Sequence, residues 1–247
     1  MSAKKATPTP LLELHGIDLR YGRVQVLFGV DLTIEDGAFV GLLGTNGAGK
    51  STVLRAVSGL SPVADGIIRF AGDDITNLPP DEIAARGLGH VPGGRGTLAD
   101  LTVEENLRLG GHLLSRSARD EGMASVVDLF PWMGNRRRQL AGTLSGGEQQ
   151  MLSIGRALVT QPRLLMVDEL SLGLAPVIVQ QLMVLLKTLH EQGTTLVIVE
   201  QHATLAMEFA HRVVFMEKGR VRFSGAGRDL AGRTDLLRSV FLGTATG

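Results

Sequence analysis

The feature that most constrains the fold is a glycine-rich turn placed between an apolar run and a helical pattern. The turn comprises Gly44, Thr45, Asn46, Gly47, Ala48, Gly49, Lys50, Ser51 and Thr52, and it fits the pattern G-x-x-x-x-G-K-[S/T]. An apolar run at 38–44 precedes the turn, and Val53, Leu54, Val57 and Leu60 follow it at helical spacing. A strand, a tight turn and a helix in this order surround a phosphate with backbone N–H groups. The sequence therefore predicts an α/β fold with a phosphate-binding loop.

The two polar residues at the end of this turn have separate predicted tasks. Lys50 supplies a positive charge to the β- and γ-phosphates, and Ser51 offers its hydroxyl to Mg²⁺. The alternative is a chance match in a chain that contains 32 glycines. The flanking strand and helix patterns argue against chance.

An acidic pair supplies the expected partner of the loop. The apolar run at 164–167 predicts a buried strand that delivers Asp168 and Glu169 to its carboxyl end, where ligands bind in open α/β sheets. Asp168 can hold Mg²⁺ through water, and Glu169 can act as general base on an attacking water. Acidic residues often end strands, so the pair alone is weak evidence for a metal and catalytic site. Together with the loop at 44–52 it is strong evidence.

A second glycine-rich helix start lies at 145–148. Ser145, Gly146 and Gly147 predict another anion-binding helix terminus. Ser145 and Glu148 also fit a capping box, which is the purely structural interpretation. Both interpretations can hold together, because a capping box does not require two glycines.

The remaining patterns predict the organisation around these motifs. Short alternating runs at 11–34 predict antiparallel strands, and the region 97–142 has helical periodicity with Thr102 as a helix N-cap. After residue 162, strand and helix patterns alternate, and 212–225 predicts a hairpin that turns at Lys218 and Gly219. This alternation predicts a parallel sheet covered on both faces.

Composition excludes several kinds of protein. The 247 residues carry 25 basic and 25 acidic side chains, so no global basic field would draw the chain to nucleic acid. Cysteine is absent, which excludes disulfides and thiolate metal sites. The apolar runs are shorter than the roughly 18 residues of a membrane span, and the N-terminus lacks the apolar core of a secretion signal. The basic run at 136–138 is interpreted as a solvated face or turn.

The motif order identifies a family. The segment LSGGEQQ at 144–150, together with the loop and the acidic pair, resembles the nucleotide-binding subunit of an ATP-binding cassette (ABC) transporter over roughly 11–225. The resemblance implies a P-loop ATPase fold that binds ATP and Mg²⁺, with an antiparallel β-subdomain and a helical subdomain inserted at about 97–160. Residues 1–10 are then an arm and 226–247 a tail. In that family two subunits pack head to tail, and each signature helix caps the γ-phosphate of ATP held by the other. This explains two phosphate sites in one chain.

The resemblance also implies individual roles. Tyr21 occupies the position of the aromatic ring that stacks on adenine, the alternative being a strand aromatic in the core. The segment 171–174 resembles the loop that crosses the dimer interface. The family commonly places a switch histidine directly after the acid that ends a strand, whereas here Glu200 is followed by Gln201 and then His202. We expect Gln201 and His202 to fill this place, the alternative for His202 being a solvated residue at the start of a helix.

One position departs from the family. Gly93 stands where the family has Gln or Glu, a side chain that touches Mg²⁺ and the attacking water. The neighbouring Arg95 is a candidate for compensation. The departure favours an alternative function, that of a hydrolysis-impaired regulatory subunit paired with an active ATPase, whereas Glu169 and the signature favour hydrolysis.

Several segments resemble one branch of the ABC transporter family. DITNLPP, HVPGGR, LTVEENLRLG, SLGLAP and VEQH resemble the ATP-binding subunits of branched-chain amino-acid importers, whose relatives also move urea or short amides. The implied partners are a second ATPase subunit, identical or different, two transmembrane permease subunits and an external solute-binding protein. The implied location is peripheral, at the cytoplasmic face of the membrane. A non-transport ATPase acting on DNA or ribosomes would typically carry two cassettes or a coiled-coil insertion, and LSGGEQQ excludes a kinase or GTPase.

Overall fold

The computed structural model describes residues 10–94, 96–200 and 207–231. The strands are β1 (Pro10–Tyr21), β2 (Val24–Glu35), β3 (Phe39–Gly44), β4 (Asp65–Phe70), β5 (Asp73–Asp74), β6 (Leu88–Val91), β7 (Leu164–Asp168), β8 (Thr195–Glu200), β9 (Arg212–Glu217) and β10 (Arg220–Gly225). The helices are α1 (Lys50–Val57), α2 (Pro80–Ala85), α3 (Val103–Gly110), α4 (Arg116–Leu129), α5 (Pro131–Asn135), α6 (Gly146–Leu158), α7 (Pro176–Glu191) and α9 (Gly227–Ala231), with a 3-10 turn at Ala141–Thr143.

The strands form two sheets. The larger sheet has the order β10-β9-β3-β8-β7-β6, and its strands run parallel except β10, which pairs antiparallel with β9. The smaller sheet, in the order β2-β1-β4-β5, is antiparallel. Both the antiparallel strands near the N-terminus and the parallel sheet were predicted, and both are confirmed.

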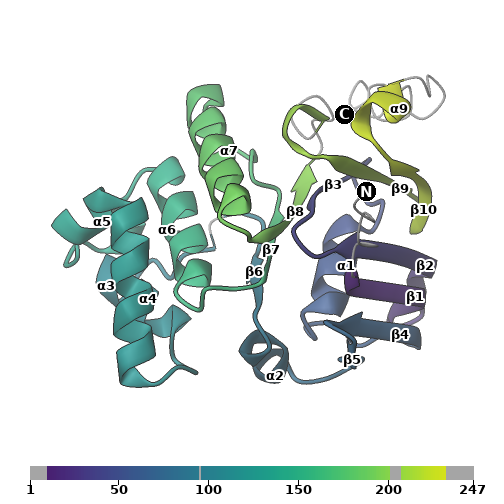
Figure 1. Cartoon of the computed structure of the whole chain (residues 1–247), viewed down its shortest axis with the longest axis horizontal. Coiled ribbons are helices and arrows are strands. Elements are labelled where there is room, and N and C mark those ends of the chain that lie inside the picture. Colours follow the sequence, from purple (N-terminus) through teal and green to yellow (C-terminus); the bar gives the residue numbers. More distant parts are fainter. Residues whose placement is uncertain (1–9, 95, 201–206, 232–247) are drawn as a thin grey trace, which may run out of the picture.

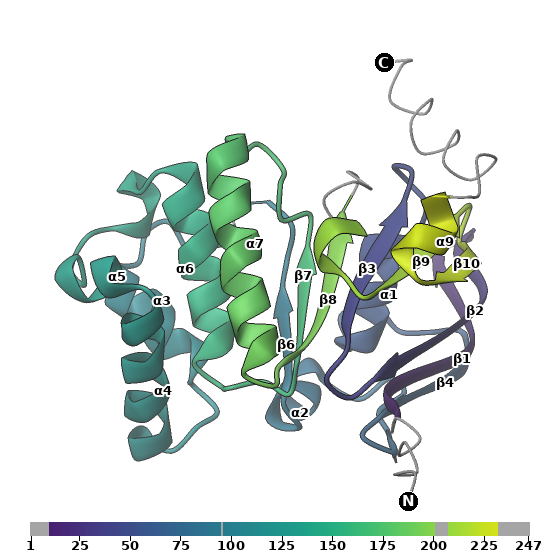
Figure 2. The same cartoon turned by 45° about the horizontal axis from the view of Figure 1, so that its top comes forward.

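The parallel sheet separates two hydrophobic cores. Along β3, Phe39 and Leu43 face one core, whereas Val40 and Leu42 face the other. The first core contains α6 and α7 together with the inner faces of α3 and α4, and the second contains α1 and the antiparallel sheet. Figure 2 shows α1 enclosed between β3 and the antiparallel strands. Strands buried on both faces need apolar residues throughout, which is why these runs were readable in the sequence.

The helices α3 to α6 lie together on one side of the molecule, away from the antiparallel sheet (Figure 1). The helix α3 begins in a capping box, in which Glu105 N donates to Thr102 Oγ1 over 3.2 Å and Thr102 N donates to Glu105 Oε2 over 2.8 Å. This confirms the predicted N-cap. The helices α3 and α6 approach so closely at Gly110 that a Cβ there would clash with the carbonyl oxygen of Arg156. The described helices include none that is both long and apolar enough to cross a membrane.

One predicted element ends earlier than its pattern indicated. Leu60 was expected on the buried face of the helix after the loop, but α1 ends at Val57 and Leu60 is 48% exposed. Ser58 Oγ donates to Leu54 O over 2.8 Å, and Gly59 adopts a left-handed φ of +69°. A left-handed glycine stops a helix, so the spacing of Leu60 was coincidental.

Candidate nucleotide-binding site

The glycine-rich loop follows the carboxyl end of β3 and is supported from behind. Gly49 is the N-cap of α1 with φ +97°, a conformation that only glycine adopts readily. Gly219 N donates to Ala48 O over 3.0 Å, and Phe28 N donates to Gly219 O over 3.0 Å. The β9–β10 turn therefore holds the loop in place. The loop borders a cavity of about 160 Å³, lined by Val26, Asn46, Gly47, Ala48, Gly49, Lys50, Ser51, Thr52 and Glu169.

The ammonium group of Lys50 lies inside the loop. Its Nζ donates to Gly44 O over 2.8 Å and to Thr45 O over 2.9 Å, and the residue is buried. Burial lowers the pKa of Lys50, while the charges of Glu169, Asp168 and Glu200 oppose that shift. The loop and the carboxyl ends of β7 and β8 thus converge on one cationic group.

Asp168 ends β7 beside the first turn of α1. Burial raises the pKa of Asp168, a side-chain hydrogen bond from Ser51 lowers it, and the net shift is upward. Its Oδ1 is buried and has no hydrogen-bond partner in the part of the chain that the structure describes. A buried carboxylate oxygen without a partner, next to a serine hydroxyl, suits a divalent cation. Among the described residues no group of three His, Cys, Asp or Glu could hold a metal ion.

Glu169 lies at the edge of the same cavity. It has a left-handed φ of +46°, and its N donates to Val199 O over 3.0 Å. Such a conformation is uncommon for a residue with a side chain and clusters at functional sites. Gly93 adjoins it, because a Cβ at position 93 would lie 3.4 Å from both Cβ and Oε2 of Glu169. A Gln or Glu side chain at position 93 would therefore start beside Glu169, the candidate general base. Arg95 lies outside the described residues.

Tyr21 lies at the end of β1 against α1. It is 44% exposed, so its interpretation as a core aromatic is wrong. Its hydroxyl is 3.1 Å from Ser61 Oγ. Partial burial raises the pKa of Tyr21, but hydrogen bonds with Ser61 and Thr52 and the charge of Arg55 outweigh burial and lower it. These contacts hold the hydroxyl beside α1 and the segment that follows it.

The second predicted phosphate site is the start of α6. Ser145 N donates to Glu148 Oε2 over 2.9 Å and Glu148 N donates to Ser145 Oγ over 3.3 Å, which confirms the capping box. A Cβ at Gly147 would lie 2.7 Å from Ile178 Cγ2 of α7, whereas a Cβ at Gly146 would come no nearer than 3.7 Å to Leu174. Packing within the chain explains the second glycine but not the first. Residues 145–148 do not line the cavity at the loop.

The run of arginines at 136–138 lies in an exposed turn, which confirms the prediction. All three residues are exposed, but Arg136 Nη1 donates to Glu148 Oε1 over 2.7 Å. Arg136 is thus an exposed turn residue that also forms an ion pair, because the segment after α5 passes beside the start of α6.

Two further contacts at the site were not predicted. Glu200, which is buried at the end of β8, accepts hydrogen bonds from Ser171 N over 3.0 Å and from Ser171 Oγ over 2.7 Å. Arg156 Nη2 of α6 donates to Gly96 O over 2.5 Å, which ties α6 to the segment after β6. The position of Glu200 directly after an apolar strand pattern could have identified it as a site residue from the sequence. Gln201 and His202 lie outside the described residues, so their switch role stays a prediction.

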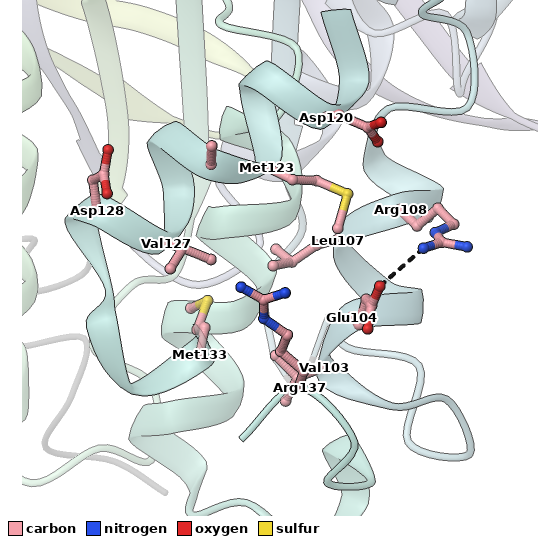
Figure 3. A pocket seen from close by; sticks show the side chains of 11 residues that line it. Val103, Glu104, Leu107, Arg108, Asp120, Met123, Val127, Asp128, Met133 and Arg137 are labelled. Carbon is pink, nitrogen blue, oxygen red and sulfur yellow. Dashed lines mark hydrogen bonds and ion pairs between the residues drawn. The ribbon is translucent and has the colours of Figure 1, made fainter. Parts of the chain in front are cut away.

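A separate groove of about 420 Å³ opens between α3, α4 and α5. Figure 3 shows apolar side chains pointing into the groove, most of the charged ones toward its edges, and the guanidinium of Arg137 between Leu107 and Met133. The apolar side chains are Val103, Leu107, Met123, Ala124, Val127 and Met133, and the charged ones are Glu104, Arg108, Asp120, Asp128 and Arg137. Arg108 Nη2 donates to Glu104 Oε1 over 2.9 Å. An apolar floor within a charged rim suits a protein segment that is itself amphipathic.

Comparisons with known proteins agree with these motifs. A family profile described as "ABC transporter" matches residues 27–171, more than half of the 247-residue chain. The chain is 41% identical over 233 residues to the high-affinity branched-chain amino acid transport ATP-binding protein BraG of Pseudomonas aeruginosa, covering 94% of this chain and 100% of the relative.

Solved structures show the same fold. The ADP conformation of an ATP-binding cassette of an ABC transporter superposes with a TM-score of 0.86 at 23% identity, covering 95% of this chain and 99% of the other. A dimeric bacterial ABC transporter cassette superposes with a TM-score of 0.78 at 26% identity, covering 88% and 99%.

Proposed function

The chain belongs to the ABC transporter family, and from this premise we propose that it powers the import of branched-chain amino acids or related small solutes. Cassettes of this family bind and hydrolyse ATP and work with transmembrane permease subunits. The name of the relative BraG supports the class of solute. The observation that carries the proposal is the convergence of Lys50, Asp168 and Glu169 beside the glycine-rich loop.

Each residue of the site then has a task. The N–H groups of the loop and the Lys50 ammonium bind the β- and γ-phosphates, and the exposed face of Tyr21 stacks on adenine. Ser51 and Asp168 would hold Mg²⁺, which would neutralise phosphate charge when bound. Glu169 accepts a proton from the water that attacks the γ-phosphate. On binding, phosphate oxygens replace the carbonyl oxygens of Gly44 and Thr45 around the Lys50 ammonium.

A second cassette completes the site. The start of α6 does not line the cavity at the chain's own loop, and a Cβ at Gly146 would make only an ordinary contact with Leu174, so packing does not require a glycine there. In the segment Ser171–Leu174, Leu172 is 56% exposed. These features suit a head-to-tail dimer in which each signature helix caps the other subunit's ATP. A similar cassette is dimeric, and the second subunit here is a copy of this chain or a related ATPase.

The groove between α3, α4 and α5 is our candidate docking site for a permease subunit. Its apolar floor fits the apolar face of a short helix, and its rim offers both signs of charge. Two permease subunits would place the chain at the cytoplasmic face of the membrane as a peripheral subunit. Solute choice then lies with the permease subunits and an external solute-binding protein.

One observation favours a second function, a regulatory subunit that binds ATP while a partner hydrolyses it. Gly93 leaves Glu169 without the neighbouring Gln or Glu side chain. Under this alternative the chain binds ATP and dimerises but turns over slowly. The intact signature and Glu169 keep hydrolysis the preferred function.

Steady-state ATPase activity of the purified chain with Mg-ATP separates these functions. We expect activity that is lost in Glu169→Gln and retained in Glu191→Gln, an exposed glutamate at the end of α7. Nucleotide binding without turnover would favour the regulatory function. A chain that binds no ATP would contradict both.

A further inference from the structure

We propose that Arg136 sets the charge of the signature end of α6, so that this end accepts the γ-phosphate of ATP held by a second copy of the chain. The inference rests on the proposed function, because it concerns the half-site that each cassette offers to the other. It assigns a positioning role to a residue outside the motifs of the site.

The start of α6 carries a negative charge close to the place where a phosphate would bind. Glu148 lies three residues after Ser145, and the backbone N–H of Ser145 lowers the pKa of Glu148, with Arg136 contributing further. Its carboxylate is therefore charged at neutral pH. An acid in the first turn stabilises the helix but repels a second anion at the same terminus.

The two carboxylate oxygens of Glu148 are used separately. Oε2 accepts the hydrogen bond from Ser145 N over 2.9 Å and so completes the capping box. Oε1 accepts the hydrogen bond from Arg136 Nη1 over 2.7 Å. Arg136 can therefore be removed without breaking the cap. In the intact pair the two formal charges cancel, and the helix terminus with its open Gly146 backbone remains to attract phosphate.

Arg136 is held in place by the helix before it. Its N donates to Trp132 O over 3.0 Å, and its guanidinium lies 5.9 Å from the Trp132 ring centroid. The next arginine, Arg137, lines the groove between α3, α4 and α5 instead. Arg138 is exposed and forms no ion pair with any residue that the structure describes. This neighbour is a matched control for the loss of one positive charge.

The test measures ATP-driven self-association in a Glu169→Gln parent, in which bound ATP is retained. Size-exclusion chromatography with light scattering gives the ATP concentration at half-maximal dimer. Arg136→Gln should raise this concentration about fivefold or more, the scale of an uncompensated charge near a protein surface. Glu148→Gln should lower it, and the double variant should return close to the parent. Arg138→Gln should leave it unchanged.

Each other result overturns the inference. Equal shifts in Arg136→Gln and Arg138→Gln would mean that only overall charge matters. A double variant that dimerises as poorly as Arg136→Gln, with a lowered melting temperature, would mean that Arg136 only supports the fold around Trp132. If the Glu169→Gln parent binds ATP but never self-associates, the inference about two copies of this chain is overturned, whereas the proposed function is not. A parent that binds no ATP removes both.

Discussion

At the scale of single residues, a missing side chain at position 93 changes what surrounds Glu169. A Cβ there would lie 3.4 Å from Glu169 Oε2, an ordinary contact, so the backbone can carry a longer side chain toward the site. We expect Gly93→Gln to raise the ATPase rate several-fold, short of the about 100-fold that a complete general acid or base contributes. Gly93→Ala is the control, since it adds the Cβ without the amide. An unchanged rate in Gly93→Gln would count against weakened hydrolysis through this position.

His90 makes the stability of the protein depend on pH. Its Nδ1 is 2.9 Å from Ser58 Oγ and its Nε2 is buried, and burial, with a smaller effect of Arg55, lowers the pKa of His90 to about 4. The unfolded chain takes up a proton below its ordinary pKa of 6.5, whereas the folded chain does so only near pH 4. The free energy of unfolding should therefore fall by about 2 kcal/mol between pH 7 and pH 5.

Urea unfolding at these two pH values measures this effect. His90→Leu should remove that part of the pH dependence, because Ser58 Oγ keeps its bond to Leu54 O. The same fall in stability in His90→Leu would assign the effect to other groups.

Residues within one motif were predictable, and residues paired across the fold were not. Lys50, Asp168 and Glu169 were singled out because each type fits its place in a strand–turn–helix pattern. The bonds from Arg136 to Glu148 and from Arg156 to Gly96 join separate segments that only packing brings together. No local spacing encodes such pairs.

At the scale of elements, the two glycines that open α6 should respond differently to a methyl group. Gly147→Ala places a Cβ 2.7 Å from Ile178 Cγ2, so the Ile178 side chain or the α6–α7 packing must shift, at a cost of about 1–3 kcal/mol in the free energy of unfolding. In Gly146→Ala the Cβ comes no nearer than 3.7 Å to Leu174, an ordinary contact, so the variant should keep the melting temperature while weakening ATP-driven dimerisation. Thermal melts and light scattering separate the two effects. A loss of stability in Gly146→Ala would show that this glycine also serves packing.

Elements were predictable where burial dictates the sequence. The strands β3, β7 and β8 have apolar interiors because both of their faces meet a core, and polar residues occur only at the ends of β7 and β8. The end of α1 was misjudged because Leu60 continues the helical spacing by coincidence, and the left-handed Gly59 ends the helix first. The spacing of apolar side chains gives no information about the left-handed backbone conformation that ends the helix.

At the scale of the whole molecule, the groove between α3, α4 and α5 should couple the chain to its permease. Ala124 is exposed on the wall of this groove, so Ala124→Arg should reduce co-purification with the transmembrane subunits from membranes at least several-fold. The ATPase activity of the isolated chain should not change. Ser125→Arg, at an exposed position that does not line the groove, is the control. Equal recovery of both variants with the permease would remove the groove as a docking site.

The support of the glycine-rich loop has a consequence for biosynthesis. The strand β3, which carries the loop, pairs only with β8 and β9 among the described strands, and the turn at Gly219 closes on Ala48 from behind. All of these supports are translated after residue 194. After the loop sequence has emerged from the ribosome, most of the chain must still be synthesised before β8, β9 and the turn at Gly219 are available to support the loop. A nascent chain that stops short of β8 therefore lacks the lateral strands that hold a nucleotide site in shape, however complete its motif is.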